Sequence, residues 1–181
     1  MVTGLLLAAG AGSRMGMPKA LVPGWLPGAV AALRDGGCVR VVVVLGARAE
    51  EARALVPHEA AVVVAEDWAA GMSHTLRAGL VALEVGDAPA ALVHLVDLPD
   101  VTADVVRRVL GVGVGPEVLA RATYDGRPGH PVLLGRTHWT GVIAEADGDR
   151  GARGYLASRD VTAVECGDLA TGQDVDSADS R

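Results

Sequence analysis

The residues best suited to chemistry form one glycine-rich stretch near the start of the 181-residue chain. Glycines let a ligand approach the main chain closely, and consecutive exposed N–H groups can cradle an anion or bond a base edge. Two cationic residues, Arg14 and Lys19, lie in the same loop and would supply positive charge to bind phosphates. The stretch therefore predicts a site for a nucleoside triphosphate, the alternative being a tight turn with solvated charges. It runs Leu7-Ala8-Ala9-Gly10-Ala11-Gly12-Ser13-Arg14-Met15-Gly16-Met17-Pro18-Lys19.

The glycine spacing argues against a dinucleotide-dependent oxidoreductase, the second function class that we consider. The pattern Gly10-x-Gly12-x-x-x-Gly16 is one residue longer than the dinucleotide fingerprint. That fingerprint also requires an acidic residue at the end of the second strand, about 20 positions on. Here the corresponding run ends Val44-Leu45-Gly46, with no acid.

A candidate metal ligand, Asp97, follows an apolar run at 90–96. Ligands bind open parallel sheets at the carboxyl ends of the strands, so Asp97 should lie beside the glycine loop. One or two carboxylates together with phosphate oxygens and water make a typical Mg²⁺ site. The alternative is a solvated turn in which Asp100 or Thr102 caps the next helix.

Two further stretches carry polar groups that suit a binding crevice. The first consists of residues that precede or open a predicted helix at 72–85, namely Asp67, Gly71, Ser73 and Thr75. The hydroxyls of Ser73 and Thr75 would form hydrogen bonds with a base or simply cap the helix. His130 lies in a glycine- and proline-rich loop, where a lone histidine is more often a structural turn residue than a catalyst.

The elements that must position these residues alternate between apolar runs and segments at helical spacing, which indicates a mostly parallel α/β sheet. The valine-rich run at 39–45 indicates a strand covered on both faces. Strands are expected at 2–7, 39–45, 60–65, 90–96, 117–124, 131–134 and 161–166, and helices at 29–35, 48–56, 72–85, 102–110, 136–146 and 151–158. Asp125-Gly126 is a turn dipeptide between a strand pair.

Length and composition limit the classes of protein. A chain of 181 residues, half of them apolar, suits one domain over 1–181 with a sizeable core. A formal net charge of -6 argues against a nucleic-acid partner, which needs a basic surface. No apolar run is long enough for a membrane span and no basic segment precedes the first strand, so we expect a cytoplasmic protein. Cys38 and Cys166 are expected to be buried apolar residues rather than a disulfide.

The string L-A-A-G-x-G-x-R-M-G-x-P-K at 7–19 resembles the signature loop of glycosyltransferase-A-like nucleotidyltransferases. Within that superfamily the chain is most similar to the molybdenum cofactor cytidylyltransferase-like (MobA/MocA-like) branch. The matching segments are W-A-A-G-M-S-H-T-L at 68–76, G-R-P-G-H-P-V at 126–132, G-D-R-G-A-R at 148–153 and D-V-D-S at 174–177.

The resemblance implies a single three-layer α/β/α Rossmann-like domain that moves CMP from CTP, with Mg²⁺, onto a phosphorylated acceptor such as molybdopterin cofactor. It implies catalytic roles for Arg14, Lys19 and Asp97. Asp97 and Asp176 would bind the metal, with Asp174 as the alternative to Asp176. The acceptor would contact His130, Asp149 and Arg153, unless Asp149 caps the following helix and Arg153 is a solvated charge. The nucleotide would contact Leu7, Ala8, Ala9, Gly10, Ala11, Gly12, Ser13, Arg14, Lys19, Asp67, Gly71 and Ser73.

Two departures from the family pattern leave a third reading open, a catalytically impaired nucleotide-binding protein. The segment after Lys19 is compressed to residues 20–28, where Trp25 would cover surface that a longer segment covers elsewhere. The final helix is nearly absent, because only five residues follow Asp176. The first departure bears on triphosphate binding and the second on the second metal ligand.

Overall fold

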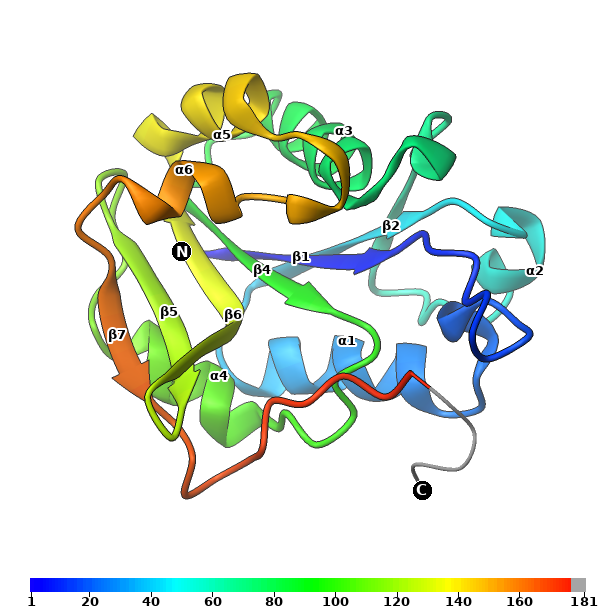
Figure 1. The fold of residues 1–181 in the computed structure, drawn as a ribbon, viewed down its shortest axis with the longest axis horizontal. Helices are drawn as coiled ribbons and strands as arrows, with labels where there is room; N and C mark the ends of the chain where they lie inside the picture. Colours follow the sequence, from blue (N-terminus) through cyan, green and yellow to red (C-terminus); the bar gives the residue numbers. More distant parts are fainter. Residues whose placement is uncertain (177–181) are drawn as a thin grey trace.

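Seven strands form one sheet at the centre of the computed structural model, which describes residues 1–176 (Figure 1). The strand order is β3-β2-β1-β4-β6-β5-β7, and all neighbours are parallel except the two pairs that include β6. The strands are β1 (Thr3–Ala8), β2 (Arg40–Leu45), β3 (Ala61–Val64), β4 (Ala90–Leu95), β5 (Leu119–Tyr124), β6 (Arg127–Gly135) and β7 (Thr162–Glu165). β1 and β4 are direct neighbours, so the glycine loop and Asp97 follow adjacent strand ends.

Helices cover both faces of this sheet, which confirms the predicted three-layer α/β fold (Figure 1). α1 (Trp25–Asp35) and α4 (Ala103–Leu110) pack together on one face. α3 (Met72–Glu84), α5 (Trp139–Glu145) and α6 (Arg153–Ala157) lie on the other. The short helix α2 (Ala49–Arg53) follows β2, and single 3₁₀ turns occur at Lys19–Leu21, Trp68–Ala70, Arg136–His138 and Gly148–Arg150.

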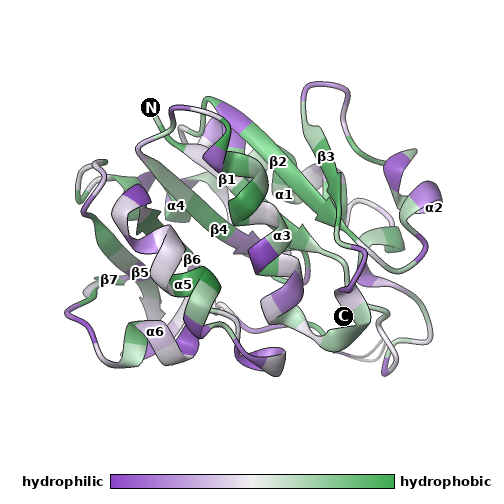
Figure 2. Ribbon diagram, turned by 90° about the horizontal axis from the view of Figure 1, so that it is seen from above, coloured by the Kyte–Doolittle hydropathy of each residue, from purple (hydrophilic) through white to green (hydrophobic). Residues whose placement is uncertain are grey.

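The central strands send alternate side chains into two separate apolar cores. In β1, Leu6 belongs to the core beneath α1 and α4, whereas Leu5 and Leu7 belong to the core beneath α3. β2 divides in the same way, since Val43 packs in the first core and Val44 in the second. Because successive side chains of a strand point to opposite faces, a strand buried on both sides is apolar along most of its length, as the green colour of β2 shows in Figure 2.

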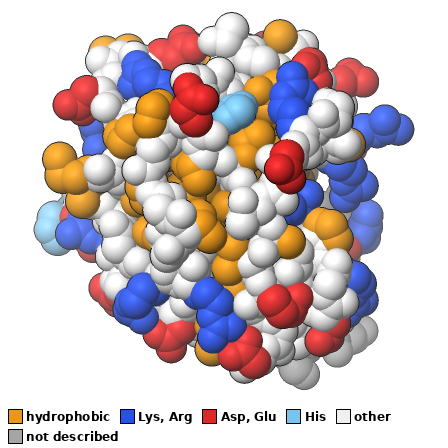
Figure 3. Space-filling view, turned by 90° about the vertical axis from the view of Figure 1, so that its left-hand side faces the viewer, with side chains coloured by type: hydrophobic (Ala, Val, Ile, Leu, Met, Phe, Trp, Pro, Cys, Tyr) orange, Lys and Arg blue, Asp and Glu red, His pale blue; other side chains and the backbone are white. Residues whose placement is uncertain are grey.

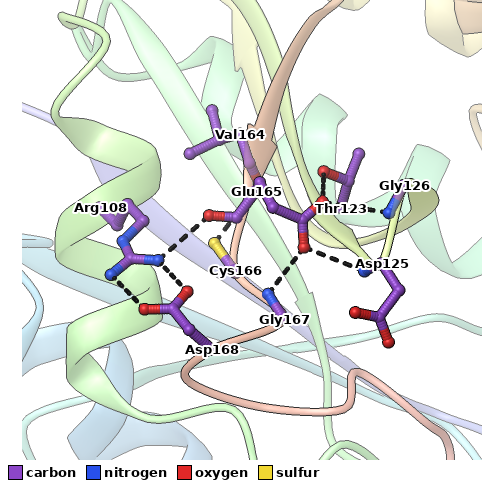
Figure 4. A network of polar contacts seen from close by, with 9 residues as sticks. All are labelled: Arg108, Thr123, Asp125, Gly126, Val164, Glu165, Cys166, Gly167 and Asp168. Carbon is purple, nitrogen blue, oxygen red and sulfur yellow. Dashed lines mark hydrogen bonds and ion pairs between the residues drawn. The ribbon is translucent and has the colours of Figure 1, made fainter.

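The β5–β6 hairpin turns at Asp125-Gly126, as the dipeptide predicted. Both residues have positive φ, +50° and +75°, which is the conformation of a type I′ turn. Glu165 of β7 holds this turn, accepting hydrogen bonds from the amides of Asp125 (2.9 Å) and Gly126 (3.1 Å) (Figure 4). It also accepts one from the Thr123 hydroxyl at 2.8 Å. These bonds lower the pKa of Glu165 to about 2, so its carboxylate stays ionised at neutral pH.

Several element boundaries differ from those expected. The first helix begins at Trp25 rather than at residue 29, although Pro27 and Gly28 lie in its first turn. The first four N–H groups of a helix lack an intrahelical acceptor, so a proline there loses no bond. Trp25 opens this helix and packs partly buried against the core. β6 begins at Arg127 instead of 131, and the last two helices are shorter than predicted.

Other sequence expectations concern cysteines, the membrane and the surface. Cys38 and Cys166 are both buried and free, as predicted. None of the helices within residues 1–176 combines the length and the apolar character that crossing a membrane requires. Figure 3 shows one face of the molecule, on which acidic and basic side chains are interspersed around exposed hydrophobic ones.

Candidate functional site

The glycine loop is anchored at its start by both neighbours of β1. The Ala47 amide donates to the Ala9 carbonyl (2.9 Å), and the Val96 amide donates to the Leu7 carbonyl (3.2 Å). Gly12 has a φ of +62°, and a Cβ at this position would collide with the Met17 carbonyl oxygen. Gly12 therefore cannot be replaced by a residue with a side chain without moving the loop.

Beyond this anchor, the loop offers a run of free backbone donors. Within the described residues, the amides at 10–13 donate no hydrogen bond to the protein. Gly10 and Ala11 are exposed, and the whole segment lines a cleft of about 450 Å³. Free amides at the end of a parallel strand are the donors that nucleotide phosphates and base edges require.

The cleft is closed by side chains from four other parts of the chain. Trp68 forms part of one wall, and its indole lies against Gly46, where a Cβ would approach the ring at 2.5 Å. The lining residues are Leu7, Ala8, Ala9, Gly10, Ala11, Gly12, Ser13, Arg14, Met15, Lys19, Trp68, Ala69, Gly71, Met72, Thr75, Leu95, Val96, Asp97, Asp149 and Asp176.

Lys19 lies between two carboxylates at the floor of the cleft. Its ammonium group donates to Asp97 and to Asp176, with both N–O distances at 2.7 Å. Burial lowers the pKa of Lys19, but the hydrogen bonds to the two carboxylates outweigh burial and leave that pKa above its ordinary value. Arg14, largely exposed, forms a second ion pair with Asp176. The Lys19 bond holds the pKa of Asp176 below its usual range, so this part of the cleft is ionised at neutral pH.

Three carboxylates meet at this point and can hold a divalent cation. Asp97, Asp174 and Asp176 each offer an oxygen atom, and these oxygens all lie within 4.8 Å of one another. Carboxylate oxygens are hard ligands that suit Mg²⁺ or Mn²⁺. The position of the Lys19 ammonium between two of the three carboxylates shows that positive charge is stabilised here. The donor set therefore fits the predicted metal, and both Asp174 and Asp176 are available to it.

The acids at 174 and 176 reach the cleft on an extended segment that follows β7. The Val175 amide donates to the Asp97 carbonyl (3.0 Å), which fixes this segment to the end of β4. The Thr171 amide and hydroxyl both donate to one oxygen of Asp100, at 2.7 and 2.6 Å. Asp100 thus anchors the C-terminal segment instead of capping α4, and Thr102 is the N-cap of α4 without a side-chain bond. Ser177, the last residue of the predicted motif, lies outside the described residues.

A second cavity of about 290 Å³ opens from the first. The two cavities share lining residues, namely Leu7, Met72, Leu95, Asp97 and Asp149. The three residues predicted for an acceptor, His130, Asp149 and Arg153, are brought together in this cavity. Burial is the main reason that the pKa of His130 falls to about 3, so the ring is neutral at physiological pH.

Asp149 joins the two cavities through the start of α3. Its Oδ1 accepts a hydrogen bond from the Met72 amide at 3.3 Å, so it caps α3 rather than the helix that follows it. Gly71 makes this approach possible, since a Cβ there would lie 2.6 Å from the Gly148 carbonyl and 2.8 Å from Asp149. Gly71 also has a φ of +119°, which a residue with a side chain rarely adopts.

Two residues predicted to contact the nucleotide do not line the cleft. Ser73 is fully buried and accepts a hydrogen bond from the Gly151 amide at 3.1 Å, so its hydroxyl ties α3 to the Asp149 loop. Asp67 is exposed at the start of the turn that carries Trp68. We therefore leave both outside the nucleotide site. Of the pair that opens α3, only Thr75 reaches the cleft.

Sequence reasoning missed Arg121, Trp68 and His94. Arg121 lines the second cavity from β5, and Trp68 lines the first. His94 is fully buried on β4, and neither of its ring nitrogens has a hydrogen-bond partner among residues 1–176. Alternation along 117–124 could have indicated which side of the strand Arg121 takes, and the apolar run at 90–96 could have indicated that His94 is buried.

The model of the MobA-like NTP transferase domain matches residues 4–163, which is most of the chain. The chain belongs to this family. Its glycine loop, Lys19 and Asp97 all fall within the matched range of this NTP transferase, so the membership predicted from the motifs is confirmed.

The chain is similar to a protein named as an oxidoreductase and to solved structures of Rv0371c. "Nicotine blue oxidoreductase" from Paenarthrobacter nicotinovorans is 38% identical, over 98% of this chain and 93% of its own length. Among solved structures, Rv0371c from Mycobacterium tuberculosis has a TM-score of 0.81 and 30% identity, covering 98% of this chain and 94% of its own. A structure of Rv0371c in complex with manganese aligns with a TM-score of 0.71 at 30% identity, over 91% of this chain and 86% of that one.

Proposed function

We propose that this NTP transferase moves a nucleoside monophosphate from a nucleoside triphosphate to a phosphorylated small-molecule acceptor. The observation that carries the proposal is the placement of the free amides at 10–13 beside Lys19 and the carboxylates of Asp97, Asp174 and Asp176. Donors for phosphate, a protonated amine and a metal-binding cluster thus meet in one cleft. The adjoining second cavity gives the acceptor a place on the other side of Asp97.

The reaction is an in-line displacement at the α-phosphorus. A phosphate oxygen of the acceptor forms a new bond to that phosphorus, and the bond to the bridging oxygen breaks so that pyrophosphate leaves. A phosphate nucleophile is already ionised at neutral pH and needs no general base. Positioning and neutralisation of charge therefore provide the catalysis. The loop amides would hold the base and phosphates, while Arg14 and Lys19 would neutralise the departing pyrophosphate.

Asp97, with Asp176 and Asp174, would hold Mg²⁺ in this cleft. The bound ion supplies additional positive charge to the phosphates of the nucleotide. Support comes from the three converging carboxylates and from the manganese complex of Rv0371c. Although no final helix is present in the described part of the chain, the extended segment brings both acids to Asp97. This observation weighs against the catalytically impaired alternative.

For the donor and acceptor we infer CTP and molybdopterin cofactor, on the resemblance of the loop and acceptor segments. The loop carries Ala9 where related guanylyltransferases for the same cofactor have a second glycine. A Cβ there restricts the backbone and makes the base pocket shallower. One methyl group discriminates by about 1–3 kcal/mol, so we expect a preference for CTP over GTP and not absolute selectivity.

A second candidate function is an oxidoreductase activity in the same two cavities, which the name of the Paenarthrobacter relative favours. Two features argue against a dinucleotide cofactor. The end of β2 has no acid, because Gly46 and Ala47 follow Leu45, and charged groups cluster around Lys19. The dinucleotide fingerprint does not call for a lysine at this place in the loop.

The deciding experiment measures two products from one purified protein. Pyrophosphate release is followed with each of CTP, GTP, ATP and UTP, with Mg²⁺ and a panel of phosphorylated acceptors that includes molybdopterin. In parallel, oxidation of reduced nicotinamide dinucleotides is followed with quinonoid dyes as electron acceptors. We expect acceptor-dependent pyrophosphate release, fastest with CTP. Dinucleotide oxidation without pyrophosphate release would replace the transferase proposal with the oxidoreductase.

Asp97→Asn supplies the matched test of the metal site. The substitution keeps the shape of the side chain and removes the charge, so turnover should fall by about a hundredfold or more, because bound metal contributes several kcal/mol. Asp35→Asn, at an exposed acid on the last turn of α1, is the control and should retain wild-type turnover. Full activity of Asp97→Asn across a Mg²⁺ titration would remove Asp97 from the metal site.

A further inference from the structure

The second cavity contains cationic side chains that the protein itself does not neutralise. Arg121 of β5 is half-buried, and its buried Nε has no hydrogen-bond partner among the described residues. Its Nη2 makes one long contact of 3.4 Å to the Gly129 carbonyl. The ion pairs found within residues 1–176 include neither Arg121 nor Arg153.

The groups around Arg121 do not pair with its positive charge. Burial lowers the pKa of Arg121, and the nearby charge of Arg153 lowers that pKa further. His130, on the adjacent strand, is neutral and supplies no counter-charge. Three acids line the cavity, and each has another role: Asp97 binds Lys19, Asp149 caps α3, and Asp174 belongs to the carboxylate cluster with Asp97 and Asp176. A half-buried guanidinium that forms no ion pair is costly, and a bound anion would offset the cost.

Much of the remaining wall of the cavity is apolar. Strand residues of β4 and β6 and helix residues of α3 and α6 line it, so the cavity lies between the sheet and these helices. The walls include Leu76, Val93, Val132, Leu134 and Leu156. A volume of about 290 Å³ is near the lower limit for small-molecule sites, which suits a planar ring system of modest size.

We propose that the second cavity binds a planar aromatic acceptor through an anionic group that Arg121 and Arg153 grip, and that Arg121 selects acidic acceptors. This inference rests on the proposed transferase function, in which the acceptor enters from that side. The ring system would lie between Val93 and Leu156, and its reacting phosphate would point toward Asp97 at the junction with the cleft. The anion at Arg121 is a second one, separate from the phosphate that reacts.

The test measures binding without chemistry. The probes are 2-naphthoate, 2-naphthyl phosphate and the uncharged 2-naphthalenemethanol, titrated calorimetrically into the full-length protein. We expect the two anions to bind at least about tenfold more tightly than the alcohol, the difference that one charge-assisted hydrogen bond provides. The carboxylate and phosphate arms show which anion the site prefers.

Arg121→Gln should weaken binding of both anionic probes by about tenfold or more and leave the alcohol unchanged. Arg153→Gln, at an exposed position, should act in the same direction and guards against a folding defect in the first variant. Arg34→Gln, an exposed arginine of α1 far from the cavity, controls for total charge and should change nothing. All three variants should bind CTP with wild-type affinity.

The outcomes separate this inference from the proposed function. Equal affinity for anions and alcohol, no binding of any probe, or anion binding that is unaffected by both Arg121→Gln and Arg153→Gln would overturn the inference, whatever the transferase assay shows. Anion binding that depends on Arg121, in a protein without pyrophosphate release, would support the anion site and overturn only the transferase reading.

Discussion

Lys19 is the only lysine in the 181-residue chain, and it lies at the centre of the charged cluster in the cleft. It lies 78 positions from Asp97 and 157 from Asp176, yet its ammonium bonds both carboxylates. A lysine is a compact point charge, suited to a phosphate that replaces one of these partners. We propose that nucleotide binding redirects this ammonium group toward the β- and γ-phosphates.

Lys19→Ala should therefore weaken triphosphate binding far more than monophosphate binding. One close charge pair in a partly shielded site is worth a few kcal/mol, so we expect a loss of about thirtyfold or more for CTP and little change for CMP. Calorimetric titration with both nucleotides measures the difference. An equal loss for the two would place Lys19 away from the terminal phosphates.

Amine acylation of the wild-type protein provides an independent control. Since Lys19 and the N-terminal amine are the only primary amines, peptide mass spectrometry reports on Lys19 without interference. CTP should protect Lys19 from acylation, and the N-terminus should react equally with and without nucleotide.

At the scale of elements, the hairpin of β5 and β6 depends on the third strand of that edge. Glu165 of β7 bonds the turn at Asp125-Gly126 and also accepts from the Gly167 amide at 2.8 Å (Figure 4). The chain after β7 then continues to Thr171 and the acids of the cleft. One carboxylate thus orders both the strand that carries Arg121 and the start of the segment that carries Asp174 and Asp176.

Glu165→Gln should lower the melting temperature measurably, because an amide cannot accept four hydrogen bonds as a carboxylate does. The depressed pKa of Glu165, about 2, gives the pH range. The contribution is fully present above the unfolded pKa near 4.5 and disappears as pH falls through about 2. Thermal melts of both proteins at pH 7 and pH 2 measure it, with Glu117→Gln as an exposed control. Identical melting curves at pH 7 would contradict the role of Glu165.

The sequence predicted the helices and strands better than it predicted the positions of single side chains. The alternation of apolar runs identified all seven strands, and Asp125-Gly126 identified the hairpin, because both signals are local. The start of α1 was missed because Pro27 normally argues against a helix, except in its first turn. Ser73 was misplaced because a helix start gives the position of a hydroxyl but not its direction, and here it points to Gly151. The cavity around Arg121 depends on packing between distant elements, which no local pattern encodes.

The stability of the whole molecule should depend on pH through one fully buried histidine, His94, and one half-buried histidine, His130. His94 lies at the centre of the sheet with both ring nitrogens unpartnered among the described residues, and burial lowers its pKa to about 4. His130 is depressed in the same direction, to about 3. Since an unfolded histidine has a pKa of 6.5, the unfolded chain binds more protons than the folded protein below this value.

The free energy of unfolding should therefore decrease as pH falls from about 6.5 toward 4, by about 3 kcal/mol for His94 alone. Its depressed pKa means that the folded protein holds the ring neutral, and protonation of the unfolded chain then favours unfolding. His94→Leu fills the same apolar site without a titrating group, so its urea stability should lose about 3 kcal/mol less than wild type between pH 7 and pH 4. His58→Gln, at a fully exposed histidine, should follow the wild-type curve. If His94→Leu and wild type lost the same stability over this range, the buried ring of His94 would not be the source of the acid sensitivity.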